Sequence, residues 1–115
     1  MIRIIRQPIT QDDLRALAEQ TFGDFVKGVV DVRRRIVALG GELHADDEAA
    51  LLQDGSAQGD LWGINLYPNI STEEWIEFDS MINLRPSQGN RSRSVESIET
   101  REYITQIVKT LIRPG

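Results

Sequence analysis

Two runs rich in β-branched residues follow each other closely in the N-terminal half of the chain, at residues 25–32 and 36–43. Only Arg33-Arg34-Arg35 separates them, and this spacing predicts a hairpin of two antiparallel strands. A second pair of runs, at residues 61–67 and 75–84, flanks a polar turn and predicts another hairpin. Because hairpins rather than helical crossovers dominate, the sheet is expected to be mainly antiparallel.

Three helices complete the predicted order of elements. The first begins after Thr10, whose hydroxyl and Asp13 form a capping-box pattern, and it ends before Gly23. Its expected buried stripe is Leu14, Leu17, Ala18 and Phe22. The second helix begins at residue 46 or 47, and the third runs from the cap at Ser97 to about residue 113. With an edge strand at residues 2–6, the order is β-α-β-β-α-β-β-α, which predicts one α+β domain over residues 1–115.

Composition narrows the possible classes of protein. The 115 residues include no cysteine, which excludes disulfides, thiolate nucleophiles and cysteine metal sites. A net charge of −5 makes nucleic-acid binding through the arginines unfavourable. No apolar run approaches the ~20 residues that span a bilayer, and the N-terminal segment does not resemble a secretory signal. A cytoplasmic protein without a membrane association is therefore expected.

Residues 75–85 alternate between two faces of the predicted strand. Ile76, Phe78 and Ile82 belong to the dry face, and the other face carries polar groups together with two large apolar side chains: Trp75, Glu77, Asp79, Met81, Asn83 and Arg85. Two carboxylates at this spacing can act as acid/base groups or hold a hard cation. The alternative is a solvated sheet face, because antiparallel sheets often leave one face wet.

The only histidine, His44, follows Glu42 and precedes an acidic helix start. An imidazole beside carboxylates suits a general base or a metal ligand, so His44, Glu77 and Asp79 are the candidate catalytic residues. A lone histidine at a strand-to-helix corner also serves as a capping or packing residue. Which metal, if any, the site takes is not defined by this pattern.

The segment after the predicted strand is cationic and contains no carboxylate. It offers arginine and amide donors that suit phosphate or carboxylate, which makes the candidate ligand-binding residues Asn83, Arg85, Asn90, Arg91 and Arg93. The segment matches neither a Walker loop nor a dinucleotide fingerprint, so no cofactor is indicated. A surface loop whose arginines pair with the acidic body is the alternative. Upstream, Gly63 and Asn65 are expected to let a backbone or a ligand approach closely.

Three strings, GGELHADDEAALLQDGS, DLWGINLYP and WIEFDSMINLRPSQGNRSR, resemble a family of small uncharacterised proteins catalogued as a domain of unknown function. The resemblance covers nearly the whole chain. It implies a single domain and carries no activity, cofactor or site residue.

Two functional hypotheses follow. The first is a small soluble protein that binds an anionic small molecule at residues 75–93, as a hydrolase or transferase if it is an enzyme. The second is a non-catalytic interaction module that forms homo-oligomers, with Trp75 and Met81 as interface anchors. If His44 lies near Glu77 and Asp79 beside the arginine-containing loop, a catalytic or metal site is indicated. If these side chains lie on opposite sides of the domain, the first hypothesis reduces to an anion-binding loop.

Overall fold

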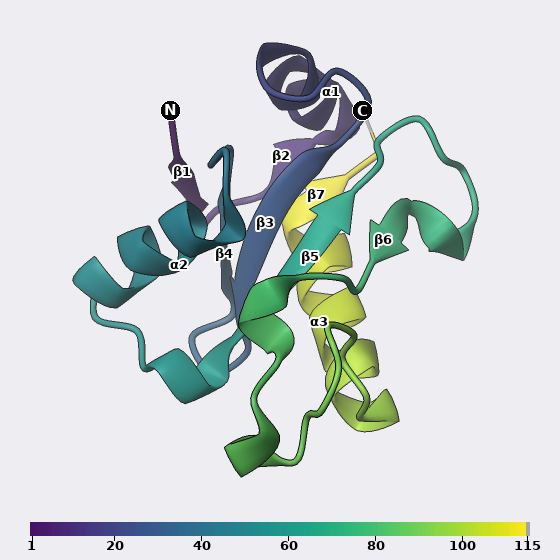
Figure 1. Cartoon of the computed structure of the whole chain (residues 1–115). Helices are drawn as coiled ribbons and strands as arrows, with labels where there is room; N and C mark the ends of the chain where they lie inside the picture. Colours follow the sequence, from purple (N-terminus) through teal and green to yellow (C-terminus); the bar gives the residue numbers. More distant parts are fainter. Residues whose placement is uncertain (115) are drawn as a thin grey trace.

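The computed structural model describes residues 1–114, so residue 115 of the predicted domain lies outside the described part. The elements form one α+β domain whose five-stranded sheet has the order β1-β4-β3-β5-β6. All four strand pairs in this sheet are antiparallel. Its strands are β1 (Arg3–Ile5), β3 (Val26–Asp31), β4 (Ile36–Leu39), β5 (Leu61–Leu66) and β6 (Ile76–Glu77). The predicted fold class, both hairpins and the edge position of the first strand are confirmed (Figure 1).

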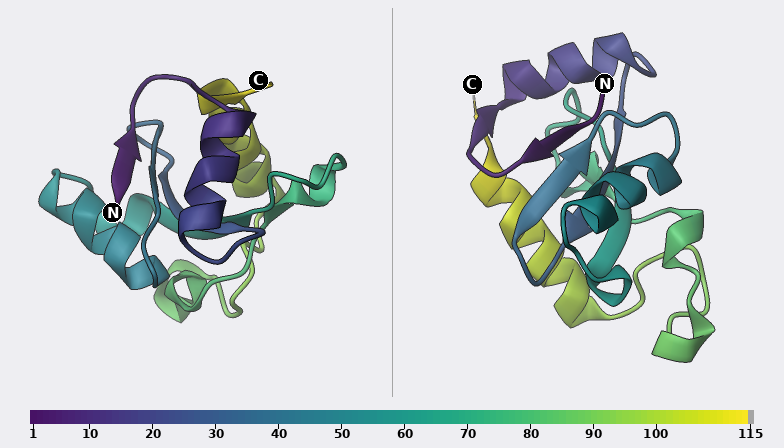
Figure 2. Two further views of the ribbon diagram at one scale, coloured as in Figure 1. Left: turned by 90° about the horizontal axis from the view of Figure 1, so that it is seen from above. Right: turned by 90° about the vertical axis from the view of Figure 1, so that its left-hand side faces the viewer.

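Helices cover both faces of the sheet. α1 (Gln11–Gln20) and α3 (Ile98–Leu111) pack on one face, and α2 (His44–Gln53) lies on the other (Figure 2). The larger core cluster takes Leu14 from α1, Ile104 from α3 and Ile64 from β5. The smaller one joins Leu51 of α2 to Val29 and neighbouring strand residues. Within residues 1–114 no helix has the length and apolar character that a membrane crossing requires.

Local sequence signals explain where the helices begin. Thr10 caps α1 through a reciprocal capping box with Asp13, and the Ser97 hydroxyl accepts a hydrogen bond from Thr100 N at the start of α3. The second helix begins earlier than predicted and includes His44. Phe22 is a further correction, because it is exposed and stacks on Phe25 instead of joining the buried stripe. The sequence also did not reveal a two-stranded parallel sheet, made of β2 (Ile9–Thr10) and β7 (Ile112–Arg113).

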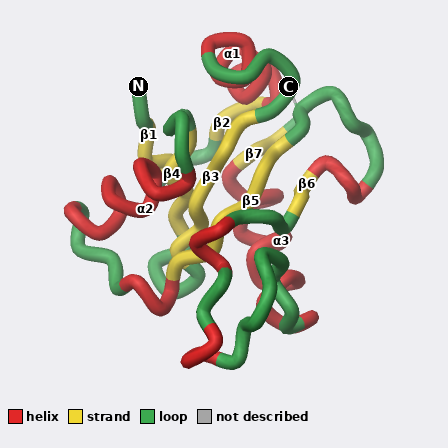
Figure 3. Tube along the Cα trace, in the orientation of Figure 1, coloured by secondary structure: helices red, strands yellow, loops and turns green. Residues whose placement is uncertain are grey.

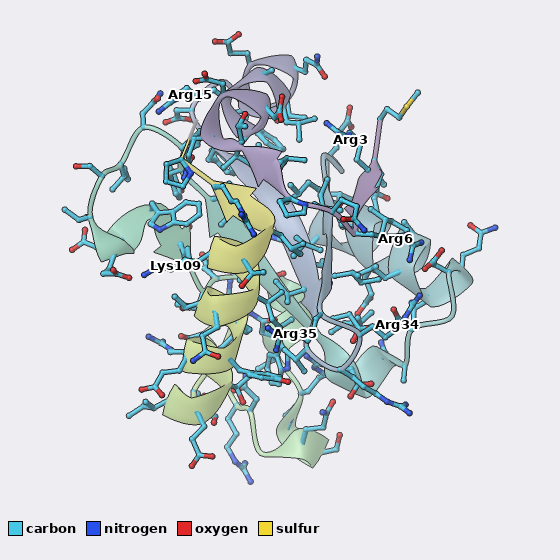
Figure 4. All side chains as sticks on the ribbon, turned by 180° about the vertical axis from the view of Figure 1, so that it is seen from behind. Arg3, Arg6, Arg15, Arg34, Arg35 and Lys109 are labelled. Carbon is cyan, nitrogen blue, oxygen red and sulfur yellow. The ribbon has the colours of Figure 1, made fainter. Side chains whose placement is uncertain are left out.

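A buried carboxylate, that of Asp31, stabilises the turn between β3 and β4. Asp31 Oδ1 accepts hydrogen bonds from the backbone N–H groups of Arg33 and Arg34, and Arg35 adopts a positive φ. Arg34 and Arg6 both form ion pairs with Asp54 at the end of α2, and Figure 4 shows both arginines on that side of the molecule. Arg34, the middle residue of the triplet, thus fastens the turn to the end of α2.

The predicted strand at residues 75–84 is wrong in its length. β6 contains only Ile76 and Glu77, and the chain then leaves the sheet through short 3₁₀ turns at Met81–Asn83 and Pro86–Gln88, visible as red turns in Figure 3. A further 3₁₀ turn, Glu73–Trp75, precedes β6, so the strand alternation does not extend back to Trp75. Trp75 is therefore only 8% exposed and belongs to the larger core, contrary to its predicted place on the wet face.

Candidate functional site

A row of three polar side chains crosses the sheet on the face that carries α2. Lys27 of β3 pairs in register with Asn65 of β5, and Asn65 pairs with Glu77 of β6. Residues that are directly opposite in an antiparallel sheet share a face, so the three side chains point to the same side. The larger core contains sequence neighbours of the row, namely Val26, Ile64, Leu66 and Ile76. Side chains alternate along a strand, so the row occupies the opposite face.

The row forms the floor of a pocket that we call the His44 pocket. The start of α2, the segment 79–82 and Arg93 contribute the walls, so segments distant in sequence meet at one place. Its volume is about 430 Å³, within the range typical of small-ligand sites. It is lined by Phe25, Lys27, Leu43, His44, Ala45, Asn65, Tyr67, Glu77, Asp79, Ser80, Met81, Ile82 and Arg93. The three predicted catalytic residues therefore lie around a single pocket.

A glycine allows the segment 80–83 to close one wall. A Cβ atom at Gly63 would lie 2.5 Å from Ser80 Cβ, so only glycine fits without a shift of this segment. Asn83 then binds the Gly63 backbone on both sides: Gly63 N donates to Asn83 Oδ1 over 2.8 Å, and Asn83 Nδ2 donates to Gly63 O over 3.0 Å. The expected close approach at Gly63 is made by a neighbouring segment of the same chain.

His44 is held at the start of α2 by a hydrogen bond to the sheet. Its Nε2 lies 2.9 Å from Ile64 O, and because a carbonyl oxygen only accepts, this nitrogen carries the proton. In the neutral ring, Nδ1 then has the lone pair and is the atom able to act as a base. Burial lowers the pKa of His44 below its ordinary value, and the hydrogen bond to Ile64 opposes that shift. The neutral form is thereby favoured at neutral pH.

Glu77 is oriented by neutral donors. Its Oε1 accepts hydrogen bonds from Asn65 Nδ2 over 2.8 Å and from Tyr67 Oη over 3.2 Å. Asn65 Nδ2 also donates to Asp79 O over 3.1 Å, which ties the floor to the next wall. Burial raises the pKa of Tyr67, and Glu77 raises it further, so the phenol keeps its proton. Within residues 1–114 the Glu77 carboxylate has no ion-pair partner.

Asp79 and Arg93 form an ion pair at the mouth of the pocket. Arg93 Nε lies 2.8 Å from Asp79 Oδ1, and both side chains are about half exposed. A pair this exposed contributes little to stability, roughly 0–1 kcal/mol. It can therefore open at low cost and present either charge to a ligand.

Three of the other four predicted ligand-binding residues use their side chains to bind backbone groups. Asn83 uses its amide on Gly63 and on Arg93 O, and Asn90 Nδ2 lies within hydrogen-bond distance of three carbonyl oxygens in the same loop. Arg85 donates to the carbonyl oxygens of Gln58 and Leu61 and covers the Trp62 ring. Arg91 is exposed and does not line the His44 pocket. Of the five residues, only Arg93 reaches that pocket.

A metal centre is not supported by the side chains present. Among residues 1–114, no group of three or more histidine, aspartate or glutamate side chains is arranged to hold a metal ion. His44, Glu77 and Asp79 share the pocket lining without forming such a cluster. Each of the three side chains can exchange a proton or form hydrogen bonds with a ligand.

Sequence reasoning missed two residues of the pocket, Lys27 and Tyr67. Lys27 is the one charged residue in the segment from Phe25 to Val30, whose other residues are apolar, and Asn65 is the one polar side chain between Trp62 and Leu66 in the strand beside it. A lone polar residue in a buried strand indicates a functional or close-contact position. That signal was available for Lys27, whereas Tyr67 gave none.

Comparison with known proteins identifies a family but no characterised relative. A family model described as "Protein of unknown function (DUF5674)" matches residues 3–111, which confirms the resemblance seen in the sequence. No curated protein and no solved structure matches the chain.

Proposed function

We propose that this chain, which belongs to the DUF5674 family of proteins of unknown function, binds a small polar molecule in the His44 pocket and exchanges a proton with it through His44. One observation carries the proposal. His44, Glu77, Asp79 and Arg93 line a single pocket although they come from separate segments of the chain. Convergence of titratable groups in a cleft is typical of ligand-binding and catalytic sites.

The proposed role of each group follows from its hydrogen bonds. Nδ1 of the neutral His44 ring accepts the proton, while the Ile64 carbonyl oxygen fixes the ring through Nε2–H. Glu77, held by Asn65 and Tyr67, binds donor groups of the ligand. The Asp79–Arg93 pair lies at the mouth, where it can rearrange as the ligand enters. Hydrolysis and group transfer on a small molecule, the classes expected from the sequence, both use such a base.

The single histidine makes a direct test possible. In the untagged protein, the ring signals of His44 are the only histidine signals in an NMR spectrum. We expect part of a library of small polar compounds to shift these signals in a saturable manner. Ala45→Trp, which fills the pocket, should abolish the shifts. Ala49→Trp on the same helix lies outside the pocket lining and should preserve them.

Two outcomes would contradict the proposal. One is a library in which no compound shifts the His44 signals. The other is an Ala45→Trp variant that remains folded and still shows the same saturable shifts, because binding would then occur elsewhere.

For any compound that the protein converts, His44→Asn should lower kcat by roughly 10²–10⁴-fold, the usual contribution of a positioned general base. Steady-state kinetics over a range of pH provides the measurement. The wild-type rate should fall as His44 becomes protonated at low pH, and the variant should lose this dependence. Unchanged kcat in the folded variant would exclude His44 as the base.

A further inference from the structure

The floor of the His44 pocket presents opposite charges on either side of a neutral amide. Lys27, Asn65 and Glu77 occupy matched positions on β3, β5 and β6. Neighbouring strands lie about 4.8 Å apart, so the backbones of Lys27 and Glu77 are separated by roughly 10 Å. Asn65 stands between them, and the two charges do not form an ion pair. A ligand lying along this row meets a cation at one end and an anion at the other.

Asn65 has an unfilled acceptor in this row. The side chain is 7% exposed, and both hydrogen bonds of its Nδ2 go to neighbouring oxygens. Its Oδ1 is buried and makes no hydrogen bond of good geometry in the described part of the chain, although the Asn65 side chain lies close enough to His44 to raise the pKa of that imidazole. A buried polar atom without a partner destabilises the folded protein, and a hydrogen-bond donor of a ligand would offset this cost. A ligand with an N–H or O–H group at the centre of the pocket floor would therefore be favoured, because that group could donate to Asn65 Oδ1.

Glu77 offers a second acceptor beside it. Both hydrogen bonds that its carboxylate receives from Asn65 and Tyr67 end on Oε1, which leaves Oε2 for a ligand. Lys27 lies at the other end, where its Nζ is 4.9 Å from the centre of the exposed Phe22 ring. Such an exposed cation–π contact is weak, so an anionic group can draw the Lys27 ammonium away from the ring.

The remaining charges do not change this pattern. Asp79 and Arg93 pair with each other, and His44 is held in its neutral form. A purely anionic ligand would bring its charge toward Glu77 and the unfilled Asn65 acceptor. A purely cationic one would leave Lys27 without a partner.

We infer that the His44 pocket binds a zwitterionic amino-carboxylate, with its ammonium group on Glu77 Oε2 and Asn65 Oδ1 and its carboxylate on Lys27. This inference rests on the proposed function and specifies its ligand class. The sequence predicted an anionic ligand on the arginine-containing loop. The ligand inferred here is zwitterionic and lies on the row of Lys27, Asn65 and Glu77.

Matched probes test this inference. Calorimetric titrations at pH 7 would compare 6-aminohexanoate with two analogues of the same chain length. Hexylamine keeps only the ammonium group, and hexanoate keeps only the carboxylate. Glycine, β-alanine and 4-aminobutanoate vary the span between the charges. We expect at least one of the amino acids to bind ten-fold or more tightly than the amine and the acid of its own chain length. This comparison uses the wild-type protein and does not depend on the folding of a variant.

Two variants assign the charges. Lys27→Met should reduce the affinity for the best amino acid to that of its matched amine, and Glu77→Gln should reduce it to that of its matched acid. Lys109→Met and Glu19→Gln, which change the same residue types outside the pocket, should leave the affinity unchanged. Circular dichroism would establish that each variant is folded.

Several results would overturn the inference. These are equal affinities for an amino acid and its one-charge analogues, no binding of any amino acid, or tighter binding of inorganic phosphate than of every amino acid. If library compounds still shift the His44 signals, the proposed function survives and only the ligand class is wrong. If neither the library nor the amino acids shift them, both proposals fail.

Discussion

His44 and Asp47 lie in the first turns of α2, and burial acts on their charges in opposite directions. Burial lowers the pKa of His44 and raises the pKa of Asp47 to about 8, so both groups are mainly neutral at pH 7. Asp47 is fully buried, and one of its carboxyl oxygens accepts a hydrogen bond from Gly41 N over 3.0 Å. The other oxygen has no partner within residues 1–114. The positive end of the helix dipole also disfavours charge on the imidazole.

The raised pKa of Asp47 predicts a pH-dependent stability. Between the ordinary pKa of 3.8 and about 8, the folded state binds a proton that the unfolded state has released. The free energy of unfolding should therefore fall by up to about 1.4 kcal/mol per pH unit over this window through this group. Asp47→Asn should remove the fall. Urea denaturation of both proteins from pH 5 to 9 would measure it.

The matched control is Asp46→Asn, which changes an exposed carboxylate in the same turn and should leave most of the slope in place. Parallel stability curves for wild type and Asp47→Asn would contradict the assignment.

His44 should titrate below its ordinary pKa of 6.5, measured from its ring signals by NMR. Its folded-state pKa is lowered, so its contribution to stability is present above 6.5 and is lost as the pH falls below that value. Lys27 lowers the pKa of His44 and Asp79 raises it, after the larger effects of burial and the Ile64 hydrogen bond. Lys27→Met should therefore raise the titration midpoint, and Asp79→Asn should lower it. Shifts in the reverse directions would contradict the charge arrangement of the pocket.

At the scale of elements, β6 ends early because side chains replace a strand along the edge of β5. β6 pairs only with Asn65 and Leu66. Farther along β5, Asn83 binds the Gly63 backbone and Arg85 binds the Leu61 carbonyl oxygen. These contacts protect the edge of β5 from pairing with another chain. They also set the position of the segment that forms a wall of the His44 pocket.

Asn83→Ala should destabilise the protein by about 2–5 kcal/mol, because it leaves two buried Gly63 backbone groups and the Arg93 carbonyl oxygen without this partner. Asn69→Ala removes an exposed side chain that accepts one hydrogen bond from Arg15, and it should change stability by less than about 0.5 kcal/mol. Urea denaturation of both variants gives the comparison. An equal loss of stability in the two variants would show that the Asn83 amide does not stabilise the edge of β5.

At the scale of the whole molecule, one face of the sheet packs against the larger apolar core, and the other face carries the smaller core cluster and the His44 pocket. α1 and α3 cover one face with an apolar core, and α2 lies over the other face (Figure 2). The polar row on that second face lines the His44 pocket. Trp75 belongs to the first face and cannot serve as the surface anchor of an oligomer in this fold. Met81, at the rim of the pocket, is 61% exposed.

Trp75→Ala should accordingly lower the free energy of unfolding by about 3–5 kcal/mol, as large truncations in a core do. Light scattering should show the same molar mass for the folded variant and for the wild type. Met81→Ala, which truncates an exposed side chain, should cost less than about 0.5 kcal/mol. A Trp75→Ala variant of normal stability that dissociates from a larger assembly would restore Trp75 as an interface residue.

Local patterns in the sequence were sufficient for the fold class and for the existence of the three helices and the two hairpins. Capping groups at Thr10 and Ser97, strand runs on either side of the arginine triplet, and the edge strand before Pro8 all act over a few residues. Such short-range interactions are encoded in neighbouring side chains, so composition and spacing reveal them. The α+β class and the order of the main elements were therefore predictable.

The content of the site depended on contacts between distant segments. Alternation alone placed Trp75, Glu77 and Asn83 on one face, because it assumes that the strand continues. The structure ends the strand at Glu77, buries Trp75 in the core and turns Asn83 onto the Gly63 backbone. Nothing in the local sequence states that two amide hydrogen bonds replace a strand pair.

By itself the sequence determined the helices, the hairpins, the family and the approximate place of the polar residues. Tertiary structure alone decided that His44 meets Glu77 and Asp79 around one pocket, that Lys27 joins them, and that Arg85 and Asn90 support the backbone. The physical reason is the range of the interactions. Helix caps and strand alternation follow the chain, whereas a pocket is built across strands from residues whose only connection is the register of the sheet.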